Sequence, residues 1–197
     1  MAQKFQMSLP PQTPSSDSPR IRGLLERARK YRGFISNHFA LMANSPGLLE
    51  TALTGYKSFR KESGFTLVEQ EVVFLTISRE HGCPYCVAAH SQIADDDSGV
   101  PPAVTDAIRD GRPVPDPKLA ALSDFTRTLV VKQGWPSRAD VEPFLAAGYT
   151  ERHILDIVLA IGVKTLSTWT NHLFGTPLDD AYTPREWSAG SAAVGAP

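Results

Sequence analysis

Four side chains in the stretch 71–90 have the types and spacing that thiol chemistry needs. Cys83 and Cys86 form a C-x-x-C pair, and His90 follows Cys86 by four residues, which places both on one face of a helix. A cysteine reacts as its thiolate, and a neighbouring imidazole can accept the thiol proton directly or through one water. The spacing therefore predicts a redox-active dithiol in which Cys86 is the attacking thiol and His90 its base.

Cys83 and Glu71 are predicted to complete this site. Once Cys86 is oxidised to a sulfenic acid, a second thiol one turn away can condense with it and prevent over-oxidation, which is the role expected for Cys83. Glu71 lies on the preceding predicted helix. If the two helices pack antiparallel, its carboxylate approaches the dithiol and completes a Glu-Cys-His proton relay.

The helices around the dithiol can be predicted from local signals. Thr66 and Glu69 form a capping box that opens a helix over 66–81. Gly82 can end that helix, and Pro84 is tolerated in the first turn of the next one. The two thiols therefore fall at a helix N-terminus, where unpaired N–H groups and the helix dipole favour the thiolate.

The rest of the chain also has helical spacing of its apolar residues, so we expect an all-α bundle. Ser45 and Pro46 resemble a helix start, and Gly64 stands where that helix should stop. Residues 72–77 favour a strand by propensity, but the capping box and the surrounding pattern favour a helix. Further helices are expected near 102–110, 117–133, 137–147 and 151–174.

Length, charge and hydropathy restrict the classes of protein that this chain can represent. Its 197 residues suit one domain over 18–187, with flexible tails expected over 1–17 and 188–197. The 20 Lys and Arg residues against 21 Asp and Glu give no reason to expect a nucleic acid or an anionic membrane as partner. No secretory signal and no apolar stretch long enough to cross a bilayer is evident. We therefore expect a cytoplasmic protein without a membrane partner.

The stretch Glu71-Val-Val-Phe-Leu-Thr-Ile-Ser-Arg-Glu-His-Gly-Cys83-Pro-Tyr85-Cys86-Val-Ala-Ala-His90 resembles a known signature. The E-x11-C-x2-C-x3-H pattern is typical of alkylhydroperoxidase D-like proteins in the carboxymuconolactone decarboxylase superfamily, and a looser resemblance extends over 37–182. The best-known hydroperoxidase branch often has histidine before its second cysteine, where this chain has Tyr85. The decarboxylase branch generally lacks the cysteine pair.

This resemblance implies an all-α helical bundle that assembles into homo-oligomers. It implies a thiol-dependent peroxidase or disulfide oxidoreductase that reduces hydroperoxides through a Cys83–Cys86 dithiol/disulfide cycle, without a cofactor. Cys86 would be the peroxidatic thiol and Cys83 the resolving thiol, while Glu71 and His90 would relay protons. The substrate would be a small-molecule peroxide, and the reductant a thiol or a protein that the sequence does not identify.

Several alternatives remain open at the level of sequence. The fold could support decarboxylation or another ring-directed reaction, or the dithiol could serve a non-catalytic redox sensor. Cys83, Cys86 and His90 could hold a metal ion with Glu71 or His81, although no second C-x-x-C pair exists. The Cys-Pro-Tyr-Cys tetrapeptide also occurs in glutaredoxins, whose thioredoxin-like sheet the helical pattern does not favour. The segment 169–172 could approach the site from a neighbouring subunit, whereas the roles expected for His38, His153 and His172 are local packing or surface roles.

Overall fold

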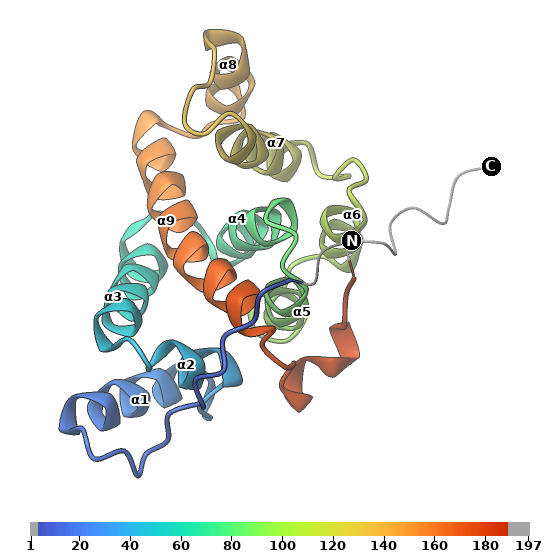
Figure 1. Ribbon diagram of the computed structural model, residues 1–197. Coiled ribbons are helices and arrows are strands. Elements are labelled where there is room, and N and C mark those ends of the chain that lie inside the picture. Colours follow the sequence, from blue (N-terminus) through green and yellow to red (C-terminus); the bar gives the residue numbers. More distant parts are fainter. Residues whose placement is uncertain (1–3, 189–197) are drawn as a thin grey trace.

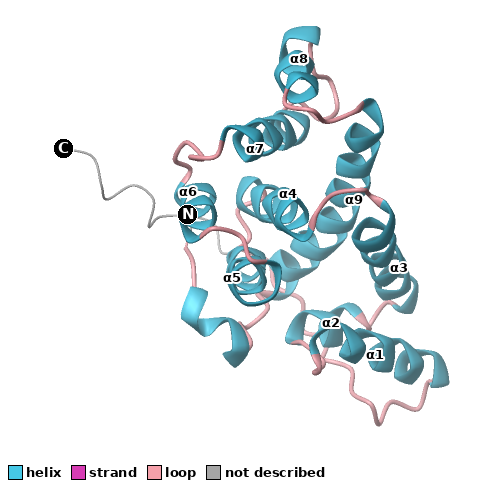
Figure 2. Cartoon of the chain, turned by 180° about the vertical axis from the view of Figure 1, so that it is seen from behind, coloured by secondary structure: helices cyan, strands magenta, loops and turns pink. Residues whose placement is uncertain are grey.

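The computed structural model describes residues 4–188, and every regular element in that range is helical (Figure 1). Seen from behind, the described chain consists of helices and loops without a strand (Figure 2). The all-α prediction is confirmed, and the thioredoxin-like alternative is wrong. The elements are α1 (Pro19–Arg32), α2 (Asn37–Met42), α3 (Pro46–Glu62), α4 (Leu67–Glu80), α5 (Pro84–Ile93), the π-helical turn η1 (Ala94–Ser98), α6 (Pro102–Asp110), α7 (Pro117–Val131), α8 (Arg138–Ala146), α9 (Glu151–Phe174) and the 3-10 helix η2 (Asp180–Arg185).

Local sequence signals determine where several of these helices begin. The capping box before α4 is present, with the Thr66 side chain accepting from the Glu69 N–H and the Glu69 carboxylate accepting from the Thr66 N–H. Helix α3 begins at Pro46 as predicted, although Ser45 makes no side-chain cap. Helix α2 was not predicted from the sequence, because its six residues are too few to show a helical period.

Helix α4 lies at the centre of the bundle and packs against α5, α6, α7 and α9 (Figure 1). Its residues from Glu69 to Ser78 are all buried, so its apolar side chains do not form a single stripe. Burial on all sides explains why the valine-rich run at 72–77 imitates a strand while forming a helix. This central helix positions Glu71 inside the molecule, with none of its surface exposed.

Helices α1 and α2 pack beside α3 and complete a second apolar cluster around Leu25, Met42 and Leu53. Helix α3 in turn packs closely on α9, because Gly55 has no side chain. A Cβ atom at Gly55 would lie 2.6 Å from a Val163 methyl group, which is closer than real Cβ contacts. The absence of a side chain at Gly55 therefore brings the middle of α9 against α3.

The N-terminal segment 4–17 contains no helix but follows the surface of the bundle. The backbone N–H groups of Met7 and Gln12 donate to carbonyls of α9 and α2 at 2.8 and 2.9 Å. The predicted division into a domain over 18–187 and two flanking tails stays a prediction, and of the second tail, 188–197, all but the first residue lies outside the described residues. Within the described part, no helix is both long and apolar enough to cross a membrane.

Candidate active site

The dithiol is located at the N-terminus of α5, as the sequence predicts. Gly82 adopts a left-handed conformation with φ of +61° between α4 and α5, and Pro84 occupies the first turn of α5. Cys83 is the N-cap residue of α5, and its sulfur accepts a hydrogen bond from the Cys86 N–H at 3.4 Å. The Cys86 N–H, one of the free N–H groups of this first turn, is therefore satisfied by the Cys83 sulfur.

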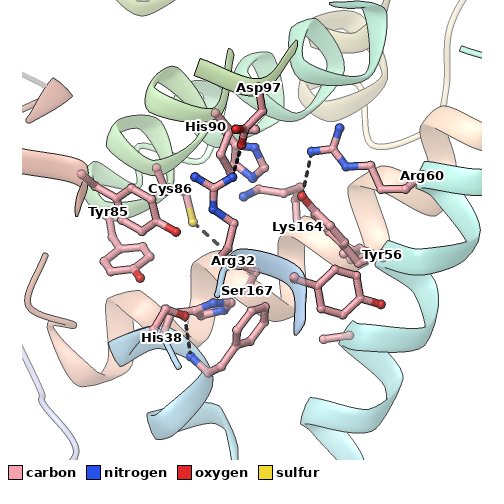
Figure 3. Close-up of a pocket in the computed structure, with 18 of the residues that line it drawn as sticks. Arg32, His38, Tyr56, Arg60, Tyr85, Cys86, His90, Asp97, Lys164 and Ser167 are labelled. Atoms are coloured by element: carbon pink, nitrogen blue, oxygen red, sulfur yellow. Dashed lines mark hydrogen bonds and ion pairs between the residues drawn. The ribbon is translucent and has the colours of Figure 1, made fainter. Parts of the chain in front are cut away.

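Only one of the two thiols lines a cavity. Cys86 lines a cavity of about 360 Å³ together with His90 on the next turn of α5 (Figure 3). Cys83 is fully buried and does not line this cavity. It belongs to an apolar cluster with Ala88 and with Tyr182 of η2, and Tyr182 also lines the cavity. A molecule in the cavity can therefore reach Cys86 but not Cys83.

Glu71 connects His90 to Arg60 through a buried chain of charged hydrogen bonds, and we call these three residues the relay. Glu71 Oε2 lies 2.8 Å from His90 Nδ1, and Oε1 accepts from the Arg60 guanidinium. Arg60 also donates to the Tyr56 hydroxyl at 2.7 Å. Because an ionised carboxylate can only accept, we assign the His90 proton to Nδ1, which leaves Nε2 as a base.

Electrostatics in the relay keep Glu71 charged and His90 neutral. Burial raises the pKa of Glu71, but His90 and Arg60 outweigh it and lower the pKa to about 2. Burial, together with the positive charge of Lys164, lowers the pKa of His90. A neutral imidazole at neutral pH is the form that can accept a proton.

The relay differs in one respect from the sequence prediction. Glu71 reaches the dithiol region through His90, and its two oxygens are both engaged within the relay. His90 and Cys86 both line the cavity, but no hydrogen bond joins them in the described structure. A proton passing between them would need a bridging water or substrate atom.

Helix α9 contributes three polar side chains, of which sequence reasoning named only Asn171, within the segment 169–172, and missed the other two. Asn171 Nδ2 donates to Cys86 Sγ at 3.3 Å and lies 3.9 Å from Cys83 Sγ, while Ser167 Oγ lies 3.6 Å from Cys86 Sγ. Lys164, one turn earlier, is 2% exposed and lines the same cavity (Figure 3). Asn171 and Ser167 thus contact the dithiol of their own chain.

The surroundings give the two thiols opposite acid strengths. Burial raises the pKa of Cys86, but the hydrogen bond from Cys83 and the positive charge of Lys164 outweigh it and hold the pKa well below its ordinary value. The hydrogen bond to Cys86, together with burial, raises the pKa of Cys83. Cys86 is therefore the more acidic thiol of the pair.

Tyr85 lines the cavity and also connects α5 to the C-terminal segment. Its hydroxyl donates to Asp179, whose carboxylate also accepts from the Asn37 N–H at 3.0 Å. His38, expected to have only a packing role, lines the cavity 5.9 Å from the Tyr85 ring. Burial lowers the pKa of His38 to about 4, so it is uncharged at neutral pH.

The residues suggested for a metal site are engaged elsewhere. His81 Nδ1 lies 2.9 Å from the Thr168 hydroxyl, and Glu71 belongs to the relay. Within residues 4–188, no three His, Cys, Asp or Glu side chains come together in a way that could hold a metal ion.

The fold is shared with solved structures of low sequence identity. A peroxidase-related protein from Ralstonia eutropha JMP134, described as an alkylhydroperoxidase AhpD core, superimposes with a TM-score of 0.77 at 22% identity, covering 88% of this chain and 93% of that chain. A peroxidase-related protein from Silicibacter sp. TM1040 gives a TM-score of 0.74 at 20% identity, covering 90% and 93%.

A third similar structure is a variant of the debrominase Bmp8 in complex with 2,3,4-tribromopyrrole. It gives a TM-score of 0.75 at 15% identity and covers 92% of this chain and 97% of that chain. No protein-family profile and no curated protein matches the sequence. The resemblance expected from the signature is thus confirmed in three dimensions, and the chain has the alkylhydroperoxidase D-like helical fold.

Proposed function

We propose that this protein is a thiol-dependent peroxidase or dithiol oxidoreductase that uses Cys86 as its attacking thiol. The observation that carries the proposal is the asymmetry of the dithiol: Cys86 lines the cavity, while Cys83 is enclosed beside it. The lowered pKa of Cys86 and the raised pKa of Cys83 agree with this geometry. The peroxidase-related structures with the same fold support the class of reaction.

In the first step, the Cys86 thiolate attacks one oxygen of a hydroperoxide and the O–O bond breaks. The sulfur becomes a sulfenic acid, and the leaving alkoxide takes up a proton. Arg60 and Glu71 hold His90 in position beside the cavity, so a proton can be exchanged there through the substrate or a water.

In the second step, Cys83 condenses with the sulfenic acid. An S–S bond forms, and the hydroxyl of the sulfenic acid leaves as water with the proton of the Cys83 thiol. Two electrons from an external thiol then return the disulfide to the dithiol, because the chain itself holds no further cysteine.

Reaction of the anaerobically reduced protein with a few equivalents of hydrogen peroxide or an alkyl hydroperoxide tests this scheme. We expect wild type to lose both thiols rapidly, Cys83→Ser to accumulate a sulfenic acid, and Cys86→Ser to remain inert. Thiols that stay reduced for hours would contradict the peroxidase proposal. Stoichiometric oxidation without turnover under any reductant would support a redox sensor instead.

A second candidate reaction is the reductive removal of a halogen from a small ring. The similarity to a debrominase structure that holds 2,3,4-tribromopyrrole favours it. The reaction would consume an aryl halide and the dithiol and would yield the dehalogenated ring, the disulfide, a halide ion and a proton. Halide release from a brominated pyrrole by the reduced protein, absent in Cys86→Ser, would establish this activity.

We also propose that the chain forms homo-oligomers in solution. The outward face of α9 leaves four large apolar side chains exposed, whereas isolated soluble domains rarely expose such groups together. They are Leu155, Val158, Trp169 and Leu173. Light scattering on the reduced protein after size-exclusion chromatography would give the subunit number, and a monomer would refute the proposal.

A further inference from the structure

Lys164 is a buried charged residue to which the dithiol chemistry described above gives only one part, a positive charge that lowers the Cys86 pKa. Its side chain is 2% exposed, although an ammonium group is rarely buried without a partner. Figure 3 shows it extending from α9 into the cavity that Cys86 and His90 also line. A charge in such a place needs a compensating group, from the protein or from a ligand.

The other cations of the cavity wall each have a carboxylate partner. Arg32 pairs with Asp97, and Arg60 pairs with Glu71. Within residues 4–188, no carboxylate oxygen lies within 4.0 Å of the Lys164 ammonium and no hydrogen bond connects it to the protein. The Lys164 ammonium lies over the aromatic ring of Phe74, 6.0 Å from the ring centroid. Among the described residues, Lys164 is therefore the cation of the cavity wall without a carboxylate partner, and the Cys86 sulfur is its anionic neighbour in the cavity.

The remainder of the cavity wall is mostly aromatic and aliphatic. Its volume of about 360 Å³ falls in the range of small-molecule sites. His38 adds an uncharged imidazole whose Nε2 has no hydrogen-bond partner in the described structure. The apolar side chains of the wall include Tyr31, Phe39, Ala52, Ala89, Ile93 and Val163.

We propose that Lys164 binds the anionic oxygen group of an organic substrate whose apolar body fills the cavity and whose reactive end faces Cys86. The class of compound is a small apolar acid, such as a hydroperoxide that carries a carboxylate. The inference rests on the proposed function for its chemistry, because it names the compounds that the dithiol attacks. The binding itself is measurable without any turnover.

A competing role for Lys164 is to balance the charge of the Cys86 thiolate alone. The two residues share the cavity, but Lys164 makes no hydrogen bond to the sulfur. The two roles predict different results. A pure counter-charge affects every substrate equally, whereas an anion site discriminates between a charged and a neutral substrate of the same shape.

Equilibrium binding of an unreactive pair of ligands to the reduced wild type is the first test. Calorimetry at neutral pH compares 4-isopropylbenzoate with 4-isopropylbenzyl alcohol, which differ mainly in charge. We expect wild type to bind the acid at least about tenfold more tightly, the gain typical of a hydrogen bond to a charged group. Lys164→Met should lose this preference and Lys164→Arg should keep most of it.

The exposed Lys57, which does not line the cavity, provides the matched control. Lys57→Met should bind both ligands like wild type, and thermal melting checks that each variant is folded. Equal affinity for acid and alcohol in wild type, no binding of the acid, or a preference that survives in Lys164→Met would each overturn the inference.

Kinetics with cumene hydroperoxide and its para-carboxylate separate this inference from the proposed function. We expect Lys164→Met to lower the ratio of kcat/KM for the acid over the neutral peroxide about tenfold. Equal slowing of both peroxides would assign Lys164 to the thiolate alone and refute the anion site. If wild type consumes neither peroxide, the peroxidase proposal fails, while the calorimetry still decides the inference.

Discussion

The two sides of the dithiol differ in how completely their polar groups are satisfied. On the side of α3 and α4, the relay pairs every charge with another and buries the carboxylate completely. On the side of α9 and α2, and within residues 4–188, Lys164 has no carboxylate partner, and Asn171 Oδ1 and His38 Nε2 have no hydrogen-bond partner. The first side is complete as folded, whereas the second still has atoms for which a ligand is the natural partner.

The largest effect is expected on the satisfied side, from Glu71→Gln. Removing the carboxylate leaves the Arg60 guanidinium partly buried without its charged partner, and breaking a buried pair in this way costs about 3 kcal/mol of unfolding free energy. Urea denaturation measures the loss. Glu50→Gln removes the exposed partner of Arg20 and serves as control, with an expected cost below about 1 kcal/mol. Equal losses in the two variants would show that the relay does not stabilise the fold.

Acid should affect His38 and Glu71, one on each side, in different pH windows. The pKa of His38 is about 4 in the folded protein and 6.5 in the unfolded chain. As the pH falls from 6.5 toward 4, the unfolded chain binds a proton at His38 and the folded protein does not, so the free energy of unfolding decreases. The lowered pKa of Glu71, about 2 against 4.5, means that its contribution to stability persists down to about pH 4.5 and is lost toward pH 2.

Unfolding free energies at pH 7, 5 and 3 test this separation. Between pH 7 and 5, wild type should lose about 2 kcal/mol more than His38→Leu. Between pH 5 and 3, wild type should lose about 2 kcal/mol more than Glu71→Gln. A His38→Leu profile that runs parallel to wild type from pH 7 to 5 would mean that the folded protein accepts a charge at this position.

The smallest effect is expected from the hydrogen bond between α9 and the thiolate. Asn171→Leu removes the donor to Cys86 Sγ, which should weaken the thiolate by about 1 kcal/mol and raise the thiol pKa accordingly. Thiolate absorbance during a pH titration measures the change. The exposed His172 on the same helix provides the control, and an unchanged titration in Asn171→Leu would remove Asn171 from the site.

The part of the site that was predictable is the part that is contiguous in sequence. Glu71, Cys83, Cys86 and His90 lie on two consecutive helices, so helical spacing and one turn at Gly82 bring them into a common region. Their capping signals are local, and local signals survive without knowledge of tertiary packing.

The site residues that the sequence did not predict lie on helices far from the dithiol along the chain, so only tertiary packing brings them close to it. Arg60 and Lys164 belong to α3 and α9, and the close approach of these helices at Gly55 is not visible in the sequence. One signal was available: Lys164 follows the apolar run at 157–163, which is an unusual position for a lysine on a helix that packs inward. A charge in such a run is worth testing as a site residue.

In the proposed dithiol cycle, the enclosure of Cys83 determines the order in which the protein can meet oxidant and reductant. After oxidation, a reducing thiol must attack the sulfur that lines the cavity, which is that of Cys86, and Cys83 is then the group released. Oxidant and reductant thus compete for one space and must alternate. We expect ping-pong kinetics with parallel double-reciprocal plots, and a reductant slender enough to enter where the product has just left.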